Sequence, residues 1–172
     1  MRTPSQHDIR LFELINRRYT HAFLDWFLPR VTVLGLGGIQ IPVIVLLWWV
    51  RRPTGGDGLL WAALGAFLLS TAVVHLIKKR VKRDRPVLHT EVRFLVPRTE
   101  HGSFPSGHTA TTFALAGVLA WYFPLWGLPL LILAALVGYS RVYVGVHFLS
   151  DVAAAALIGI ISAAICVVGA SA

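Results

Sequence analysis

The sequence predicts an all-α membrane protein, a polytopic bundle of about six transmembrane helices preceded by one interfacial helix. Of its 172 residues, 56% are hydrophobic and only 14% are charged, against a usual charged share of about 25% in soluble domains. No Asp, Glu, Lys or Arg lies between Glu100 and Arg141, and none follows Asp151. Such long uncharged runs must be solvated by lipid or by one another. We therefore expect one integral-membrane domain over residues 1–172.

The first twenty residues predict a helix that lies in the membrane interface, with a solvated helix as the alternative. Ile9, Phe12, Ile15 and Tyr19 recur at helical spacing, and arginines stand between them. This start is polar and mixed in charge, whereas a cleavable signal peptide has a basic tip and a short apolar core. We expect no cleaved signal, and the apolar segments themselves would direct insertion.

Six apolar segments follow, and each is a candidate span. About 20 helical residues cross roughly 30 Å of hydrocarbon, and fewer suffice where neighbours shelter a short helix. The segments are His21 to Leu36, Gly38 to Val50, Gly58 to Ile77, Pro105 to Phe123, Leu125 to Val144, and Phe148 to Gly169. Gly- and Pro-rich turns at Leu34 to Gly38 and Arg51 to Gly58 predict antiparallel neighbours. Small residues such as Gly117 and Gly138 would let the later helices approach closely.

The conspicuous polar groups occur at only four places along these spans. If six spans alternate in direction, the end of the third, the start of the fourth, the end of the fifth and the start of the sixth share one face. A basic run from Lys78 to Arg85, the tetrapeptide from Pro105 to His108, and the segment from Ser140 to Asp151 occupy those places. We therefore expect three distant segments to converge there.

The basic run itself has an ordinary interpretation. The net charge of +8 suits nucleic acid, anionic lipid or a phosphorylated substrate, and composition does not separate these. Taken singly, Lys79, Arg80, Lys82 and Arg83 are typical of a solvated or lipid-anchoring patch. The run lacks the interleaved aromatic residues that stack on nucleic-acid bases, so we expect no nucleic-acid partner.

Arg141 and His147 are different, because ionisable groups beside apolar runs are costly and usually functional. Asp151 lies four residues after His147, on the same face of a helix that has begun by then. A carboxylate there would fix one ring nitrogen and stabilise the cation formed when the other nitrogen reacts. An interfacial ion pair is the alternative interpretation of this pair.

The stretch from Pro105 to His108 combines features of a helix start and of an anion site. Unpaired N–H groups and the positive end of the helix dipole would favour an anion at Ser106, Gly107 and His108. Gly107 would admit an oxygen to the backbone, Ser106 would add a hydroxyl donor, and His108 could protonate a leaving group. A plain helix cap explains the serine and the proline but not the histidine.

Together these groups predict a phosphate pocket with a histidine nucleophile. Guanidinium offers a planar pair of donors and ammonium a point charge, and both bind phosphate. The reaction class that requires this set is phosphoryl transfer through a covalent phosphohistidine, with the developing charge held by fixed donors.

Three motifs make the chain resemble the type 2 phosphatidic acid phosphatases, which share their phosphate site with vanadium haloperoxidases and bacterial acid phosphatases. The first is Lys, six residues, then Arg-Pro, at Lys78, Arg85 and Pro86. The second is Pro-Ser-Gly-His at Pro105 to His108. The third is Ser-Arg, five residues, His, three residues and Asp, at Ser140 to Asp151. No position within the motifs departs from the family pattern.

The resemblance implies a role for each matched residue. His147 would be the nucleophile, Asp151 its orienting partner, and His108 the general acid and then the base that activates water. The phosphoryl oxygens would be bound by Lys78, Arg85, Ser106, Arg141 and the backbone N–H of Gly107. The family needs no metal or other cofactor. The core of the resemblance, residues 78–151, leaves the first two spans and the N-terminal helix unassigned.

Two other functions are compatible with parts of the sequence. A metal hydrolase would use the seven histidines, but they include no close His-x-x-x-His pair of the kind zinc sites use. A binder of anionic lipid or a small transporter would also want a basic face, but would not require the spacing of His147 and Asp151. The lone Cys166 is expected to be a small buried hydrophobe.

Substrate and orientation follow from analogy. The resemblance implies a bacterial cytoplasmic membrane enzyme that acts on a phosphorylated lipid, with undecaprenyl diphosphate first, then phosphatidylglycerophosphate, then phosphatidic acid or lipid A. The segment from Lys78 to Arg98 contains eight Lys or Arg residues. Six more, in the N-terminal segment and at Arg51 and Arg52, are assigned to the opposite face. A literal positive-inside count would place the site in the cytoplasm, whereas the bacterial relatives suggest the extracytoplasmic side, which we expect. The tryptophans are expected to anchor the bundle at the membrane interfaces, and the alternative is that they line a groove for lipid.

Overall fold

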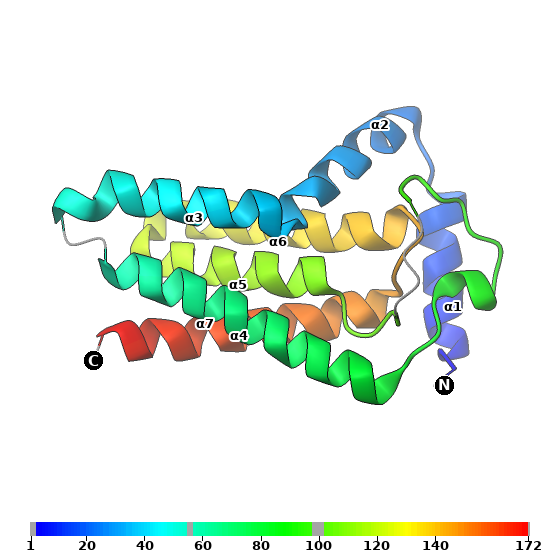
Figure 1. The fold of residues 1–172 in the computed structure, drawn as a ribbon. Helices are drawn as coiled ribbons and strands as arrows, with labels where there is room; N and C mark the ends of the chain where they lie inside the picture. Colours follow the sequence, from blue (N-terminus) through cyan, green and yellow to red (C-terminus); the bar gives the residue numbers. More distant parts are fainter. Residues whose placement is uncertain (1–2, 55–56, 98–101, 172) are drawn as a thin grey trace.

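The structure, a computed structural model, describes residues 3–54, 57–97 and 102–171, and its elements there are helices. Five of them run along one bundle (Figure 1): α3 (Gly37–Arg51), α4 (Asp57–Val81), α5 (Gly107–Tyr122), α6 (Pro124–Tyr143) and α7 (Leu149–Ser171). Short helices occupy the remainder: α1 (Gln6–Glu13), η1 (Leu14–Arg18), α2 (Ala22–Val31), η2 (Thr32–Gly35), η3 (Arg52–Thr54) and η4 (Pro86–Leu88). The predicted all-α class is confirmed.

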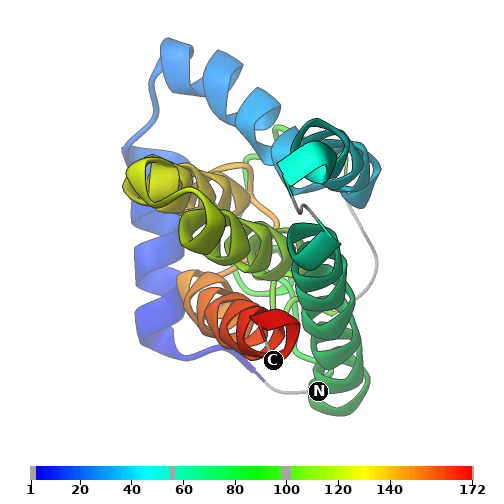
Figure 2. The same cartoon turned by 90° about the vertical axis from the view of Figure 1, so that its left-hand side faces the viewer.

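The helices from α4 onward agree with the last four predicted spans to within a few residues. Within the described ranges, α4, α6 and α7 are long and apolar enough to cross a membrane, judged by length and composition. The 16 residues of α5 give about 24 Å at 1.5 Å per residue. This short helix packs against α4, α6 and α7, which shelter it (Figure 2). The predicted total of six crossings is not confirmed, because it counts the segments of α2 and α3 as two separate spans.

The first two predicted spans are where the structure differs. Instead of an antiparallel pair, α2 and α3 form one pair that is bent by 62° at Leu36. The glycines on either side of Leu36 interrupt the helix but do not reverse it. Gln40, which is buried, donates from Nε2 to the Leu34 carbonyl at 3.1 Å, so the break keeps its backbone acceptor satisfied. The prediction of two antiparallel spans here was wrong, because hydropathy does not encode the direction of a break.

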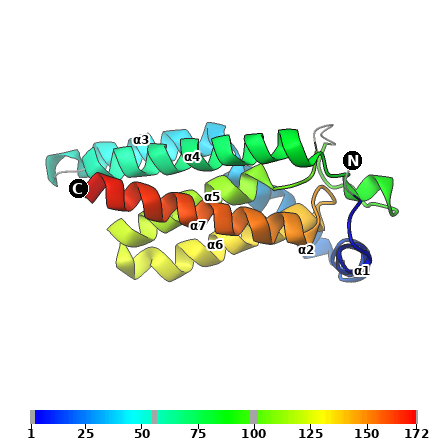
Figure 3. The ribbon, with the colours of Figure 1, turned by 90° about the horizontal axis from the view of Figure 1, so that it is seen from below.

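The predicted N-terminal helix is present and lies across one end of the bundle (Figures 1 and 3). Ser5 caps it by accepting a hydrogen bond from the Asp8 backbone N–H at 3.1 Å. Its apolar side packs on protein: Phe12 is fully buried and meets Phe148 edge-on at a centroid distance of 5.8 Å. Part of the apolar periodicity that suggested a lipid contact therefore serves tertiary packing.

The centre of the bundle is an apolar cluster of small and branched side chains from α3, α4, α5 and α7. As the sequence suggested, small residues allow close helix approach: a Cβ added to Gly117 would lie 2.7 Å from Ala163 Cβ. The exterior is apolar as well, and Trp49, Trp61, Trp121 and Trp126 are each more than half exposed. These four lie near the end opposite to α1, which favours the predicted anchoring role over a place beside the site.

Candidate active site

The loop between α6 and α7 carries the predicted nucleophile. Gly145 adopts a φ of +93°, a conformation that glycine adopts readily. A Cβ there would also lie 2.6 Å from Val92 Cγ1. The backbone N–H groups of Val146 and His147 then both turn back to the Arg141 carbonyl, at 3.2 and 3.3 Å. This tight turn places His147 immediately before α7, with its side chain buried.

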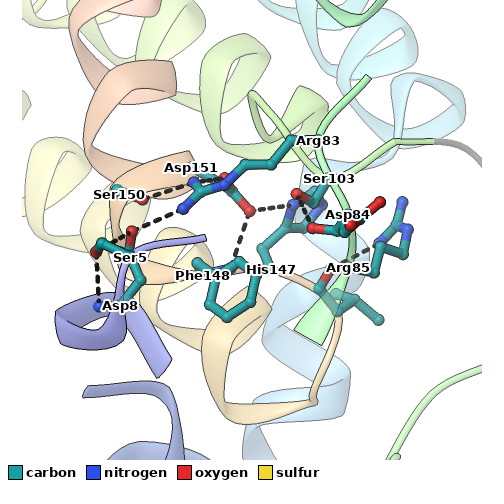
Figure 4. A network of polar contacts seen from close by, with 11 residues as sticks. Ser5, Asp8, Arg83, Asp84, Arg85, Ser103, His147, Phe148, Ser150 and Asp151 are labelled. Carbon is teal, nitrogen blue, oxygen red and sulfur yellow. Dashed lines mark hydrogen bonds and ion pairs between the residues drawn. The ribbon is translucent and has the colours of Figure 1, made fainter. Parts of the chain in front are cut away.

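The Asp151 carboxylate contacts both the Phe148 backbone N–H and the His147 ring (Figure 4). Its Oδ2 accepts a hydrogen bond from the Phe148 backbone N–H at 2.9 Å, which caps the start of α7 in the manner of a capping box. The same oxygen lies 3.4 Å from Nδ1 of His147, an ion-pair distance whose geometry falls short of a hydrogen bond among the described residues. The carboxylate is fully buried. It thus faces one ring nitrogen of His147 and leaves the other nitrogen for chemistry.

The protonation state of His147 follows from its surroundings. Burial lowers its pKa to about 4, and the nearby Arg141 and Arg85 act in the same direction, while Asp151 opposes them. Because this value lies far below neutrality, the imidazole is uncharged at pH 7. A neutral imidazole has the free electron pair that a nucleophile needs.

The start of α5 lies beside this pair, as the parity of the spans predicted. The Ser106 backbone N–H donates to the Asp151 carbonyl at 3.2 Å, which joins the second and third motifs directly. Ser106 is the N-cap residue of α5, and its fully buried hydroxyl accepts from Thr109 Oγ1 at 2.9 Å. A Cβ added at Gly107 would meet only Val74 Cγ1 at 4.0 Å. The first turn of α5 is therefore open to an anion.

Three cations surround the same point. Arg141 is 7% exposed, and its Nη1 donates to Thr32 Oγ1 at 2.6 Å. Its Nε is buried with no hydrogen-bond partner among the described residues, as expected of a donor that awaits a ligand. Arg85 donates to the Val146 carbonyl at 2.6 Å. Lys78 lies within electrostatic reach of Arg85, Arg141 and Asp151.

A cavity of about 430 Å³ opens beside this cluster. Its lining includes Lys78, Gly107 and His108, together with apolar side chains such as Leu36, Phe67 and Val74. Since Gly35 to Gly37 also line it, the break between α2 and α3 forms one wall. The lining of the cavity thus combines a lysine and a histidine with apolar side chains, a combination that suits an amphiphilic molecule.

All eight sequence-predicted site residues thus gather at one end of the bundle. Lys79, Arg80 and Lys82 are exposed, which agrees with the solvated patch expected for them. Arg83 is different: its side chain is only 10% exposed and contacts Asp151 and Asp8. The expectation of a solvated Arg83 was wrong, because its carboxylate partners come from α7 and α1, which no local spacing reveals.

Sequence reasoning also missed residues at the break between α2 and α3. Thr32 binds Arg141, and Gly35 packs so closely on His108 that a Cβ there would lie 2.7 Å from the histidine Cβ. Only the glycine-rich composition of this turn hinted at a close approach. The N-terminal segment is a further correction, because Asp8 pairs with Arg83 and places α1 at the site end, not at the opposite face.

Of the other histidines within the described ranges, His75 lines the same cavity, whereas His7, His21 and His89 are not among its lining residues. Within the described ranges, no group of three or more His, Cys, Asp or Glu is placed to hold a metal ion. His101 lies outside the described residues. Cys166 is a free, partly buried thiol beside the apolar cluster, and a Cβ on Gly65 would meet its sulfur at 3.2 Å.

The bundle, the order of the motifs and the buried His–Asp pair define a class of protein, and comparison with known families agrees. The chain belongs to the PAP2 superfamily, whose family model matches residues 59–171. The resemblance inferred from the three motifs is thereby confirmed.

Particular relatives carry more specific names. The chain is 32% identical over 154 residues to an undecaprenyl-diphosphatase of Sulfolobus acidocaldarius, covering 88% of this chain and 73% of that one. It is 30% identical over 120 residues to the bacitracin transport permease protein BcrC of Bacillus licheniformis, covering 69% of this chain. The chain spans only 59% of the length of BcrC.

Two solved structures have the same fold. LpxE of Aquifex aeolicus superposes with a TM-score of 0.83 and 36% identity, over 94% of this chain and 95% of that one. A transmembrane PAP2-type phosphatidylglycerolphosphate phosphatase of Bacillus subtilis gives a TM-score of 0.78 and 26% identity, over 93% and 82% of the two chains. The chain is therefore a membrane protein of this fold.

Proposed function

We propose that the protein is an integral-membrane lipid phosphatase or diphosphatase that works through a phosphohistidine. The observation that carries this proposal is the convergence of three distant segments on a buried His147–Asp151 pair, beside the open first turn of α5 and three cations. Family membership and relatives named as phosphatases support it.

In the first half of the reaction, the unprotonated ring nitrogen of His147 attacks the phosphorus atom. The bond from phosphorus to the lipid-side oxygen breaks, and His108 gives that oxygen a proton. Nδ1 of His147, which carries the single N–H proton of the neutral ring, faces Asp151. The carboxylate therefore stabilises the cationic phosphoimidazole. Lys78, Arg85, Arg141, the Ser106 hydroxyl and the Gly107 N–H bind the phosphoryl oxygens as charge develops on them.

In the second half, water replaces the lipid beside His108. His108 takes a proton from the water as its oxygen attacks phosphorus, and the bond between phosphorus and nitrogen breaks. Inorganic phosphate leaves and His147 returns to its neutral form. A single histidine can serve both halves because the acid of the first step becomes the base of the second.

The cavity supports a lipid as the substrate. Lys78 and the Gly107 backbone would hold the phosphate, while Leu36, Phe67 and Val74 would contact the apolar part of the molecule. We propose undecaprenyl diphosphate as the physiological substrate, on the analogy of the named relative. Phosphatidylglycerophosphate is the second candidate, which the second solved structure favours, and phosphatidic acid and lipid A follow.

A non-enzymatic lipid binder or small transporter is the alternative from another class. It would use the basic end of the bundle and the apolar cavity. Binding or transport of a lipid does not require a neutral, buried His147 whose second ring nitrogen is left free. The two functions therefore differ in their dependence on His147.

The test is phosphate release by the purified protein in detergent with EDTA, across undecaprenyl diphosphate, phosphatidylglycerophosphate, phosphatidic acid and lipid A. We expect release that survives EDTA and falls by about 10⁴-fold or more in His147→Ala, as when a catalytic nucleophile is removed. The ranking of rates would identify the substrate. No release from any of the four lipids by folded protein, or release abolished by EDTA, would contradict the proposal.

We further propose that the protein lies in the bacterial cytoplasmic membrane with its site on the extracytoplasmic side. The count of Lys and Arg residues favours a cytoplasmic site by the positive-inside rule. It does so more strongly because the N-terminal segment, with its arginines, lies at the site end. Three of those charges, however, are engaged within the protein: Arg83 pairs with Asp8, Arg93 with Asp25, and Arg17 with Glu91.

Cysteine labelling decides the orientation. With Cys166 replaced by Ala, Leu88→Cys reports on the site end, where Leu88 is 61% exposed. Arg52→Cys, at the opposite end, is the matched control. An impermeant thiol reagent on intact cells should label Leu88→Cys and spare Arg52→Cys, and the reverse pattern would place the site in the cytoplasm.

A further inference from the structure

Arg83 occupies a place in the site that none of the three motifs assigns to it. Its Nη1 donates to Asp151 Oδ1 at 2.5 Å and to Ser150 Oγ at 2.7 Å, and its Nη2 donates to Asp8 Oδ2 at 2.7 Å (Figure 4). The guanidinium also lies 4.9 Å from the centre of the Phe148 ring. Three parts of the chain, α1, the loop after α4 and the start of α7, therefore meet at one side chain.

The two oxygens of Asp151 are divided between different partners. Oδ1 is taken by Arg83, whereas Oδ2 faces the Phe148 N–H and the His147 ring. A carboxylate held at one oxygen by a charged donor cannot rotate freely about its terminal bond, so the direction of the second oxygen is fixed as well. Arg83 thus acts on His147 through Asp151, without touching His147.

Asp8 holds the guanidinium from the opposite side. Although burial alone would raise the pKa of Asp8, hydrogen bonds from Ser150 and Arg83 hold it below its usual value, so the carboxylate is charged at neutral pH. Arg83 lies between two carboxylates and satisfies both. Without Asp8, the positive charge of Arg83 would act on Asp151 alone.

We propose that Arg83, anchored by Asp8 of the N-terminal helix, is a positioning residue for phosphoryl transfer: it orients Asp151 toward His147 and moderates the attraction between that carboxylate and the imidazole. The inference rests on the proposed role of His147. It gives the N-terminal helix a function, since α1 supplies the anchor from outside the conserved motifs of the family.

The charges around His147 determine the sign of each expected effect. Asp151 from α7 favours the protonated ring, whereas Arg141 from α6 and Arg85 from the loop after α4 oppose it, and His108 from α5 lies nearby. Removing Arg83 leaves Asp151 to act on His147 unopposed by that cation, which favours the protonated ring. Neutralising Asp8 has the opposite effect, because it strengthens the field of Arg83 at Asp151.

The experiment compares Arg83→Gln, Arg83→Lys, Asp8→Asn and the double variant with Arg80→Gln, a matched control at an exposed arginine of the same basic run. In Arg83→Gln we expect kcat to fall by about 10- to 100-fold, as for partners that orient metal-bound histidines, while KM stays within about threefold. The acid limb of kcat/KM should move up by about one pH unit. In Asp8→Asn the acid limb should move down. Arg83→Lys should recover part of the kcat that Arg83→Gln loses.

The double variant tests whether Asp8 acts through Arg83. If it does, Asp8→Asn adds nothing to the pH profile once Arg83 is Gln, whereas independent sites would add their effects. Unmoved acid limbs in both single variants, with a lower melting temperature, would mean a merely structural ion pair and would overturn the inference.

A second measurement does not depend on activity. In ¹⁵N-histidine NMR, the His147 signal is identified by its loss in His147→Gln, and its titration midpoint should rise in Arg83→Gln and fall in Asp8→Asn. Equal midpoints in all variants would overturn the inference even for an active enzyme. If the wild-type protein releases no phosphate from any lipid, the proposed function fails, and these midpoints still decide whether Arg83 controls His147.

Discussion

The two ends of the bundle are built from different kinds of side chain. At the site end, polar and charged groups are buried: Ser106, Ser140, Arg141, His147 and Asp151 are all at most 7% exposed. Away from it, the core consists of apolar residues such as Leu59, Ala63 and Leu119, and tryptophans ring the far end.

The side chains at the site end are suited to chemistry, whereas those of the apolar core are suited to packing. Buried polar groups are costly unless they are paired or await a ligand, so each residue type at the site end is dictated by a specific partner. In the apolar core, side chains of similar volume can replace one another at small cost. Substitutions at the site end should therefore change activity more than stability, and substitutions in the core should do the reverse.

The largest expected effect among these substitutions is at the break between α2 and α3. In Gly35→Ala, the new methyl would lie 2.7 Å from the Cβ of His108 and push the proposed general acid out of place. A displacement near 1 Å costs about 100-fold in rate, so we expect kcat to fall by that order. Phosphate release and thermal unfolding in detergent measure the two effects side by side.

Gly38→Ala is the matched control for this prediction, because nothing lies within 4 Å of a Cβ at Gly38. It should keep full activity. Equal losses of kcat in the two variants would contradict the proposed distinction between the site end and the core. A loss of kcat in Gly35→Ala that is explained by a lower melting temperature would contradict it as well.

The apolar core supplies the converse test. Gly117→Ala would place a methyl 2.7 Å from Ala163 Cβ, where α5 and α7 pack closely. Overpacking of this kind costs about 1–3 kcal/mol of stability, while the folded protein should retain its kcat. Gly169→Ala, with nothing within 4 Å of its Cβ, is the control and should leave the melting temperature unchanged. A large loss of kcat in folded Gly117→Ala would contradict the comparison.

The smallest expected effect is in the pH dependence of the wild-type enzyme. Because burial lowers the pKa of His147 from 6.5 to about 4, this proposed nucleophile stays neutral as the pH falls through 6.5. Its protonation, and with it the loss of kcat/KM, should occur only as the pH approaches the lower value. A profile corrected for the ionisation of the substrate, titrated separately, measures this. A fall centred near 6.5 would mean that His147 is not buried in the working enzyme.

The sequence predicted the second half of the molecule well because two independent signals coincide there. Uncharged runs delimit α4 to α7, and the parity of these helices correctly placed Lys78, His108 and His147 at one end. The spacing of His147 and Asp151 also predicted their contact, but for another geometric reason: His147 lies just before α7, and Asp151 reaches back to it from the first turn of that helix.

The first half was harder to predict for physical reasons. Hydropathy measures how apolar a segment is but not whether a glycine break bends or reverses the chain, so the pair α2–α3 was misjudged. The contact between Asp8 and Arg83 joins residues 75 positions apart and belongs to no periodic pattern. Such long-range ion pairs depend on the packed fold, which local spacing in the sequence does not reveal.

The most direct test of the central claim is to trap the phosphoryl group on the protein. The wild-type enzyme is mixed rapidly with ³²P-labelled lipid substrate, quenched in alkali, in which phosphohistidine survives, and digested for mass spectrometry. The account predicts label on the peptide that contains His147, and none in His147→Asn. Phosphate release by the wild-type enzyme with no label on His147, or with label on another residue, would contradict it.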